Sequence, residues 1–324
     1  MIARGGLRVC AAWLKPHTGS SIAVATTGAV AYARVLFNSD SGVRGFASLV
    51  SSEWLKESEA SGKKLLIVDC EQPTAFQRAH IPNAQPFALA SSGLKDPNST
   101  SVIGENYFAQ VLNLLQVQED ATLVFYDDDF GLKSTRLWWV FHHFGFPKEQ
   151  LKVLDGGWKQ WVVGMNAVST GAPQELKLDA SAPLWKTAAT PTGGALVDLA
   201  AVQKGLAEGS SQFIDSRTPA EYSGQNANGN ARAGHVPGAV SFNWVNAVDY
   251  AKNGTFKSRG ELEAVFTDLF GLKKDKEVVT YCQRGIRAAH TAFVLSEVLE
   301  FENVKIYEDS MAQYLNRDDT AVEQ

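Results

Sequence analysis

HIPNA at residues 80–84 and HVPGA at residues 235–239 share one pattern. Each block follows an apolar run that ends in aspartate, LLIVD at residues 65–69 and FID at residues 213–215. The histidines of the two blocks lie 155 positions apart. A pattern that returns in the same order after a long interval indicates that a domain has been duplicated within the chain.

Further pairs of segments repeat at nearly the same spacing. TLVFY at residues 122–126 returns as VVTY at residues 278–281, again with 155 positions between the two tyrosines. LKVLD at residues 151–155 returns as VKIYE at residues 304–308, after 153 positions. Matches in one order and at one offset therefore predict two copies of a single domain.

The repeated runs are short, apolar and rich in β-branched residues, which is typical of buried parallel strands. Amphipathic segments lie between them. In the second copy, two sets of residues each share one helical face: Ala288, Ala292, Leu295 and Leu299, and before them Leu262, Val265, Phe266 and Leu269. This alternation predicts an α/β fold in which each copy is a parallel sheet with helices on both faces.

The chain, at 324 residues, is long enough for two domains. We expect a leader over residues 1–46, a first domain over 47–165, a linker over 166–194 and a second domain over 195–324. The linker is rich in Ala, Pro, Thr, Ser and Gly and shows no sustained period.

The leader has the composition of a mitochondrial transit peptide. Its first 39 residues contain no Asp or Glu, but they include Arg4, Arg8, Lys15 and Arg34. We expect a mitochondrial matrix protein. The alternative is a disordered or signal-like tail on a cytoplasmic protein. The apolar run 22–37 is interrupted and short for a membrane span, so no membrane association is expected.

The composition also argues against some classes of partner and site. The net charge is −5 with no basic stripe, which argues against nucleic acid. The cysteines, Cys10, Cys70 and Cys282, have unrelated spacings, so neither a disulfide framework nor a CxxC metal site is expected. A reducing compartment fits this pattern.

The stretch YCQRGIRAAH, residues 281–290, places Cys282 between a strand and a helix. A thiol at a helix N-terminus feels the positive end of the helix dipole, and Arg284 and Arg287 add positive charge. Both effects favour the thiolate, which is the reactive form. Gly285 allows the loop to curl with positive φ, so that successive N–H groups can face the sulfur.

A free cysteine is more often a small buried apolar residue than a nucleophile. The glycine and arginines around Cys282 favour a reactive thiol there. Cys70 also follows a strand, but the first basic residue after it is Arg78, so we expect it to be structural. In the first copy, Asp127 stands where the second copy has Cys282.

These features resemble the rhodanese family, the two-domain sulfurtransferases that act on thiosulfate or 3-mercaptopyruvate. The resemblance covers residues 47–324. It rests on the duplicated block that runs from aspartate to His-[Ile/Val]-Pro-x-Ala, on DGGW at residues 155–158, and on a Cys-x-x-Gly-x-Arg loop in the second copy only.

The resemblance implies that the second domain is catalytic and the first inactive. Cys282 would take a sulfane sulfur from a small anionic donor and hold it as a persulfide. A thiol or cyanide would then accept the sulfur, in a ping-pong scheme that needs no cofactor or metal. The persulfide would be cradled by the loop residues Gln283, Arg284, Gly285, Ile286 and Arg287.

The same resemblance suggests roles for other residues. Arg284 and Arg287 would bind the anionic end of the donor, unless one of them pairs with Asp215 or faces solvent. Arg217 matches a strand-end Asp-x-Arg motif, where a structural ion pair with Asp215 and a substrate role are both open. His80 and His235 match the family's His-Pro turn and are expected to be structural.

Two departures from the family pattern concern the donor. Glu221 replaces an arginine that usually binds substrate, and Arg232 is a candidate substitute for it. EDSM at residues 308–311 replaces the usual Asp-Gly-Ser-Trp. The pair Gln283-Arg284 favours thiosulfate, because the mercaptopyruvate enzymes carry small neutral residues there, and 3-mercaptopyruvate is the second choice.

Two other functions stay open. Cysteine phosphatases and arsenate reductases use a similar loop but place five residues between Cys and Arg, whereas four separate Cys282 from Arg287. A persulfide carrier or docking protein, fed by a protein donor, is the non-enzymatic alternative. The two-domain relatives imply a monomer.

Overall fold

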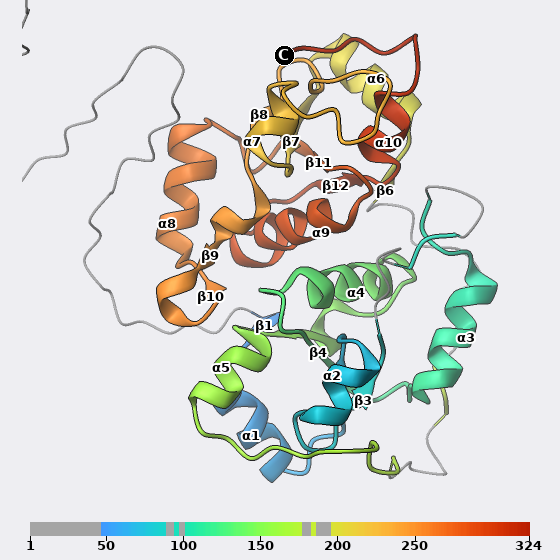
Figure 1. Ribbon diagram of the computed structural model, residues 1–324, viewed down its shortest axis with the longest axis vertical. Coiled ribbons are helices and arrows are strands. Elements are labelled where there is room, and N and C mark those ends of the chain that lie inside the picture. The colour runs from blue at the N-terminus through green and yellow to red at the C-terminus, as the bar shows by residue number, and fades with distance from the viewer. Residues whose placement is uncertain (1–46, 89–93, 97–100, 177–182, 186–195) are drawn as a thin grey trace, which may run out of the picture. The chain divides into compact units, whose positions relative to one another are not determined.

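The computed structural model describes residues 47–88, 94–96, 101–176, 183–185 and 196–324 (Figure 1). The leader expected at 1–46 and much of the linker expected at 166–194 lie outside these residues. The described residues belong to one compact unit. No helix among them is long and apolar enough to cross a membrane.

The first domain is built on a five-stranded sheet in the order β1-β5-β4-β2-β3, and every pair of neighbours in it is parallel. Its strands are β1 (Leu49–Val50), β2 (Leu65–Asp69), β3 (Gln85–Pro86), β4 (Thr122–Tyr126) and β5 (Leu151–Leu154). The apolar runs found in the sequence therefore form the centre of the sheet.

The second domain repeats this topology in the order β6-β12-β11-β7-β8, again wholly parallel. Its strands are β6 (Leu196–Val197), β7 (Ser211–Asp215), β8 (Val240–Ser241), β11 (Glu277–Tyr281) and β12 (Val304–Tyr307). A short hairpin of β9 (Val248–Asp249) and β10 (Thr255–Phe256) stands apart from it. The prediction of a tandem α/β fold with parallel sheets is confirmed.

Helices cover both faces of each sheet. In the first domain they are α1 (Ser52–Ala60), α2 (Pro73–Arg78), α3 (Glu105–Leu115), α4 (Leu132–His143) and α5 (Gly157–Val163). In the second they are α6 (Leu199–Glu208), α7 (Pro219–Tyr222), α8 (Arg259–Glu263), α9 (Ile286–Phe293) and α10 (Ser310–Tyr314). Short 3₁₀ turns lie at η1 (Lys148–Gln150), η2 (Trp244–Ala247) and η3 (Tyr250–Lys252).

Alternation along the strands explains why both faces are covered. In β4, Leu123 and Phe125 pack with α3 and α4, whereas Val124 and Tyr126 pack in a separate cluster with α1, α2 and α5. Successive side chains of a strand point to opposite faces, so an all-apolar strand requires an apolar layer on each side.

One sequence expectation about helix faces is wrong. Leu262 and Phe266 are buried, but Leu269 is 65% exposed. The helix continues after α8 as a π-helix, η4 (Ala264–Leu269), in which the Phe270 N–H donates to the carbonyl of Val265, five residues back. The wider turn changes the phase of the helix, so Leu269 leaves the face that a regular α-helix would give it.

The two domains meet through α4 and α9, which lie next to each other in Figure 1. The rings of Trp138 on α4 and Phe293 on α9 make an edge contact with centroids 5.2 Å apart. Since each of these helices follows the central strand of its own sheet, the loops before α4 and α9 are brought to the domain interface. Those loops contain Asp127 and Cys282.

Candidate functional site

Cys282 follows β11 directly, and its side chain is buried. The next turn ends at Gly285, which has a φ of +82° and forms the N-cap of α9. The Gly285 N–H donates to the Cys282 Sγ at 3.1 Å. A glycine is required here because other residues rarely adopt this backbone conformation. The loop therefore directs a backbone donor at the sulfur from the positive end of a helix.

The turn between β12 and α10 holds this loop from one side. The Cys282 N–H donates to the Ser310 Oγ at 3.2 Å. The N–H groups of Met311 and Ala312 donate to the carbonyls of Cys282 and Gln283 at 3.1 and 3.0 Å. The segment that departs from the family motif, 308–311, is thus the support of the cysteine loop.

The matching loop of the first domain binds an anion of its own. The carboxylate of Asp127, buried after β4, accepts four backbone N–H groups. The donors are Asp129 at 2.8 Å, Gly131 at 2.9 Å, Lys133 at 3.0 Å and Ser134 at 2.7 Å. Gly131 caps α4 with a φ of +85°, as Gly285 caps α9. In both copies the loop therefore directs backbone N–H groups at the side chain that follows the central strand: four at the Asp127 carboxylate and that of Gly285 at the Cys282 Sγ.

The two predicted donor-binding arginines have different surroundings. Arg284 is exposed and makes no hydrogen bond or ion pair with any residue that the structure describes. Arg287 is paired: its Nη1 and Nη2 donate to the two carboxylate oxygens of Glu221 at 2.8 and 2.9 Å. A bidentate pair of this kind is both strong and directional.

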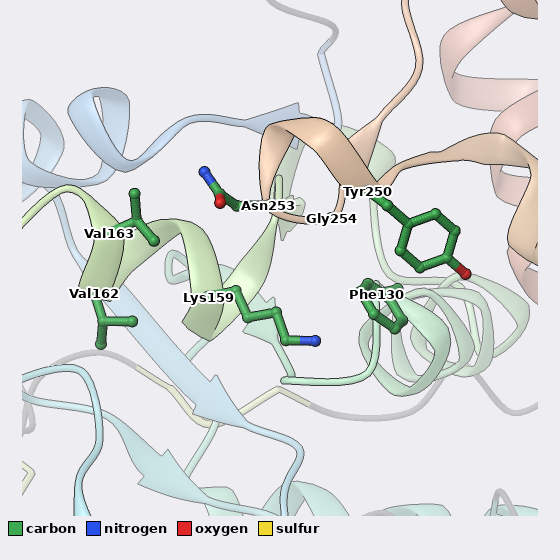
Figure 2. A pocket seen from close by; sticks show the side chains of 7 residues that line it. All are labelled: Phe130, Lys159, Val162, Val163, Tyr250, Asn253 and Gly254. Carbon is green, nitrogen blue, oxygen red and sulfur yellow. The ribbon is translucent and has the colours of Figure 1, made fainter.

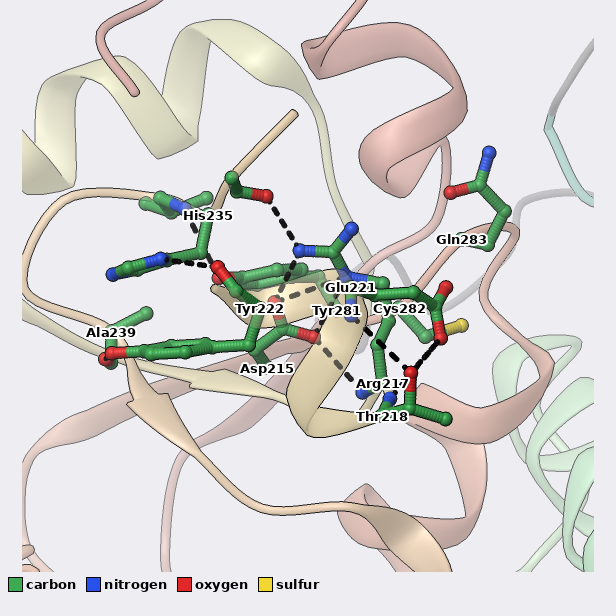
Figure 3. Close-up of polar contacts among 12 residues, drawn as sticks. Asp215, Arg217, Thr218, Glu221, Tyr222, His235, Ala239, Tyr281, Cys282 and Gln283 are labelled. Atoms are coloured by element: carbon green, nitrogen blue, oxygen red, sulfur yellow. Dashed lines mark hydrogen bonds and ion pairs between the residues drawn. The ribbon is translucent and has the colours of Figure 1, made fainter. Parts of the chain in front are cut away.

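Glu221 is fixed on α7 by a capping box with Thr218, and Asn228 donates to its Oε1 at 2.8 Å. Burial raises the pKa of Glu221, but the hydrogen bonds and charge of Arg287 outweigh burial and lower this pKa to about 2. Glu221 is therefore an anion at neutral pH. Figure 3 shows its contacts with Thr218. The residue that replaces a substrate-binding arginine neutralises Arg287 instead.

Arg217 and Arg232, the other candidate ligands, have partners away from the sulfur. The Arg217 guanidinium is fully buried, pairs with the Asp215 carboxylate and donates to the Gly234 carbonyl at 2.7 Å (Figure 3). Arg232 donates to the carbonyls of Tyr314 and Thr320 in the C-terminal segment. These contacts hold both side chains to the chain itself, although the Arg217 Nη1 and the Arg232 Nε have no hydrogen-bond partner among the described residues.

Several other expectations agree with the geometry. Cys70 is fully buried, and burial raises the pKa of its thiol, as do nearby carboxylates. His80 stacks on Phe76 and donates from Nδ1 to the Phe76 carbonyl at 2.8 Å. His235 makes the corresponding contacts with Tyr222 (Figure 3). Both histidines bind the turn to the preceding helix.

A buried ion cluster next to the cysteine loop was not found from the sequence. Glu308, at the end of β12, accepts from Lys95 at 2.8 Å and from the two Nη groups of Arg136 at 2.5 and 2.9 Å. Lys95 and Arg136 belong to the first domain. Glu308 had been noticed as a departure from the family motif, but neither basic residue carries a local signal of its partner.

A pocket of about 310 Å³ lies elsewhere. It is lined by Phe130, Lys159, Val162, Val163, Tyr250, Asn253 and Gly254 (Figure 2). None of these residues belongs to the loop 282–287. We therefore do not assign this pocket to the reaction at Cys282. Among the described residues, no group of three or more His, Cys, Asp or Glu side chains is placed to hold a metal ion.

The model of the Rhodanese-like domain family matches the chain twice, over residues 51–163 and 198–317. The chain belongs to the rhodanese-like family. It is 31% identical over 276 residues to a thiosulfate sulfurtransferase of Corynebacterium glutamicum, covering 83% of this chain and 87% of that one. It is 30% identical to a sulfur carrier protein of Thermus thermophilus, covering 83% and 93%.

Solved structures have a similar fold. SseA from Escherichia coli, described as a 3-mercaptopyruvate sulfotransferase, superposes with a TM-score of 0.67 at 27% identity, covering 81% of this chain and 98% of SseA. YnjE superposes with a TM-score of 0.72 at 18% identity, covering 86% and 68%. Because the sequence relatives named above are bacterial, they do not support the mitochondrial expectation.

Proposed function

We propose that this rhodanese-like protein is a sulfurtransferase that carries a sulfane sulfur on Cys282. The observation that carries the proposal is the pair of equivalent loops. In the first domain the cradle holds the Asp127 carboxylate with four backbone N–H groups, and in the second the Cys282 sulfur has the corresponding place. A loop that stabilises a carboxylate in one copy is suited to a sulfur anion in the other.

The chemistry follows from a thiolate at that position. The Cys282 thiolate attacks the outer sulfur of thiosulfate, the S–S bond of thiosulfate breaks, and sulfite leaves with the electron pair. The sulfur stays as a Cys282 persulfide anion. An acceptor thiolate or cyanide then attacks that outer sulfur and regenerates the thiolate, and with cyanide the product is thiocyanate.

Arg284 is the residue that we assign to the anionic end of the donor, because its guanidinium is exposed beside the loop. Gln283 joins it at the mouth, held to Asn230 by reciprocal amide hydrogen bonds of 3.0 and 3.1 Å. Gly285 donates its backbone N–H to the sulfur, and we assign the backbone N–H groups of Ile286 and Arg287 to the persulfide. With a free arginine after the cysteine, thiosulfate is the preferred donor and 3-mercaptopyruvate the second.

A persulfide carrier is the second candidate, because the Thermus thermophilus relative is named a sulfur carrier protein. In that role a protein donor would load Cys282 and a protein acceptor would unload it. The acid-free leader remains a prediction of a mitochondrial matrix address, with the cytoplasm as the alternative. The monomeric state, the domain bounds 47–165 and 195–324 and the inactive first domain also remain predictions.

The experiment that separates these functions measures sulfur transfer to cyanide with thiosulfate and with 3-mercaptopyruvate as donors. Wild-type protein and Cys282→Ser are compared, and intact-protein mass spectrometry after donor treatment reports one added sulfur atom. We expect turnover and the added sulfur only when Cys282 is present. If thiosulfate and 3-mercaptopyruvate both leave the wild-type mass unchanged, the small-molecule enzyme is excluded and the carrier is favoured.

A further inference from the structure

The catalytic loop has an acidic neighbour. Glu308 is buried where β12 ends, and it packs directly on Gly285. A Cβ built on Gly285 would lie 2.6 Å from the Glu308 Oε2 and 3.1 Å from its carbonyl oxygen. The carboxylate therefore lies against the residue whose backbone N–H donates to the sulfur. A bare carboxylate at this place would repel a sulfur anion on Cys282.

Lys95 and Arg136 hold this carboxylate from the other domain. Arg136, on α4, forms two hydrogen bonds with it, at 2.5 and 2.9 Å. The Lys95 Nζ lies 2.8 Å from the Glu308 Oε1 and 3.1 Å from the Glu308 carbonyl oxygen. The side chains of all three residues are at most 6% exposed, so solvent screens their charges weakly.

The surroundings of Lys95 affect its pKa. Burial lowers the pKa of Lys95, while the negative charge of Glu308 raises it and a smaller contribution from Cys282 acts in the same direction. Burial likewise raises the pKa of Glu308, but Arg136 and Lys95 outweigh this and lower it. The Lys95 ammonium and the Glu308 carboxylate thus belong to one buried ion cluster, which spans the two domains and lies against the cysteine loop at Gly285.

We propose that Lys95, from the domain without a catalytic cysteine, is a positioning residue for sulfur transfer. It offsets the Glu308 carboxylate and fixes it against Gly285, so that the loop presents its N–H groups to a sulfur anion without an opposing negative charge. This inference rests on the proposed function of Cys282. It gives the first domain a role in the reaction although its own loop carries Asp127.

A charge-cancelling set of variants tests this role. Lys95→Met removes the cation and leaves Glu308 with less compensation, whereas Lys95→Met/Glu308→Gln removes both charges. Lys148→Met is the matched control, because Lys148 makes an interdomain ion pair of 2.7 Å with Glu297 away from the cysteine loop. Thermal unfolding of each variant checks that it is folded before its reactivity is compared.

Two rates are measured at about pH 7, where thiolate content controls reactivity. The first is alkylation of Cys282 by iodoacetamide, a neutral reagent that needs no sulfur donor. The second is single-turnover loading of sulfur from thiosulfate, followed by intact-protein mass. We expect Lys95→Met to slow both rates about tenfold and the double variant to recover most of that loss. Lys148→Met should stay within about twofold of the wild type.

Glu308→Gln gives an independent test of the sign. It keeps both cations and removes the carboxylate, so alkylation should be as fast as in the wild type or faster. This comparison also serves if Lys95→Met does not fold. Three results would each overturn the role of Lys95. They are rates in Lys95→Met equal to those of the wild type, rates in the double variant as slow as those of Lys95→Met, and slower alkylation in Glu308→Gln than in the wild type.

The alkylation rates keep this inference separate from the proposed function. If no variant, including the wild type, takes sulfur from thiosulfate, the proposed enzymatic function fails. The alkylation series would still decide whether Lys95 acts on Cys282.

Discussion

Asp127 and Cys282 occupy the same position in two copies of one fold, 155 residues apart, and each directs its side chain into a backbone cradle at the start of a helix. The cradles differ in length. Three residues separate Asp127 from its capping glycine, Gly131, and two separate Cys282 from Gly285. The longer loop surrounds a carboxylate with four N–H donors, and in the shorter one the Gly285 N–H donates to the Cys282 Sγ.

Asp127→Asn should destabilise the protein by about 3 kcal/mol. Two backbone N–H groups bind each carboxylate oxygen of Asp127, and the amide would replace one of these oxygens with an NH₂ group that faces the N–H donors. Urea unfolding measures the change in the free energy of unfolding. Asp128→Asn is the matched control, since Asp128 is the exposed neighbour, and it should change the free energy of unfolding by less than about 0.5 kcal/mol. Equal effects of the two variants would show that the carboxylate is not what the cradle needs.

Arg284→Ala should raise the KM for thiosulfate about tenfold with little change in kcat, because the lost charge acts in binding the donor. The exposed side chain makes no hydrogen bond or ion pair with a described residue, so the melting temperature should stay the same. Arg284→Lys keeps the positive charge but lacks the planar guanidinium. Its KM for thiosulfate should lie between those of the wild type and Arg284→Ala. A fall in kcat at unchanged KM would move Arg284 from donor binding to the chemical step.

Glu221→Gln should have the opposite effect on donor binding. Without the carboxylate, Arg287 can turn its charge towards an anionic donor, so we expect the KM for thiosulfate to fall about threefold to tenfold. The same change should lower the free energy of unfolding by about 2 kcal/mol, since it breaks a largely buried pair. Asn228→Ala removes only one hydrogen bond to Glu221 and should leave KM unchanged. A KM for Glu221→Gln equal to that of the wild type would mean that Arg287 serves only to hold α7.

The sequence was sufficient to predict the duplicated α/β fold, because buried parallel strands leave apolar runs whose order survives duplication. It also located Cys282 and Gly285, since the turn between a strand and a helix has its own residue chemistry. The partner of Arg287 was not predicted. The stretch Thr-Pro-Ala-Glu at 218–221 predicts a capping box. Nothing in this local sequence indicates that Glu221 pairs with Arg287, 66 residues further along the chain.

Lys95 and Arg136 show the same limit more strongly. Their carboxylate, Glu308, lies 213 and 172 residues away in the chain, in the other domain. Such a contact depends on how α4 and α9 pack, which no periodicity within one copy records. The prediction for Leu269 was wrong for a different reason. A π-helical turn changes the phase of the helix, so Leu269 does not lie on the buried face that a regular helical period predicts.

His290 should make the protein sensitive to acid. It is fully buried on α9, stacks on Phe256, and donates from Nε2 to the carbonyl of Phe130 in the first domain at 3.2 Å. Its Nδ1 has no hydrogen-bond partner among the described residues, so a second proton there would be unsatisfied. Burial therefore lowers the pKa of His290 to about 4, against the opposing hydrogen bond to Phe130.

The sign follows from proton binding. Between the unfolded pKa of about 6.5 and the folded pKa of about 4, the unfolded chain binds more protons, so stability falls as the pH falls through this window by up to about 3 kcal/mol. Above about pH 6.5 this loss is absent.

Urea unfolding of wild type and His290→Gln at about pH 7, 5.5 and 4.5 measures how the free energy of unfolding of each protein depends on pH. We expect the variant to be less stable at neutral pH, through lost packing, but to lose less stability on acidification. The residual slope should come in part from His143, whose pKa burial also lowers to about 4. Parallel curves for the two proteins would exclude His290 as a source of acid sensitivity.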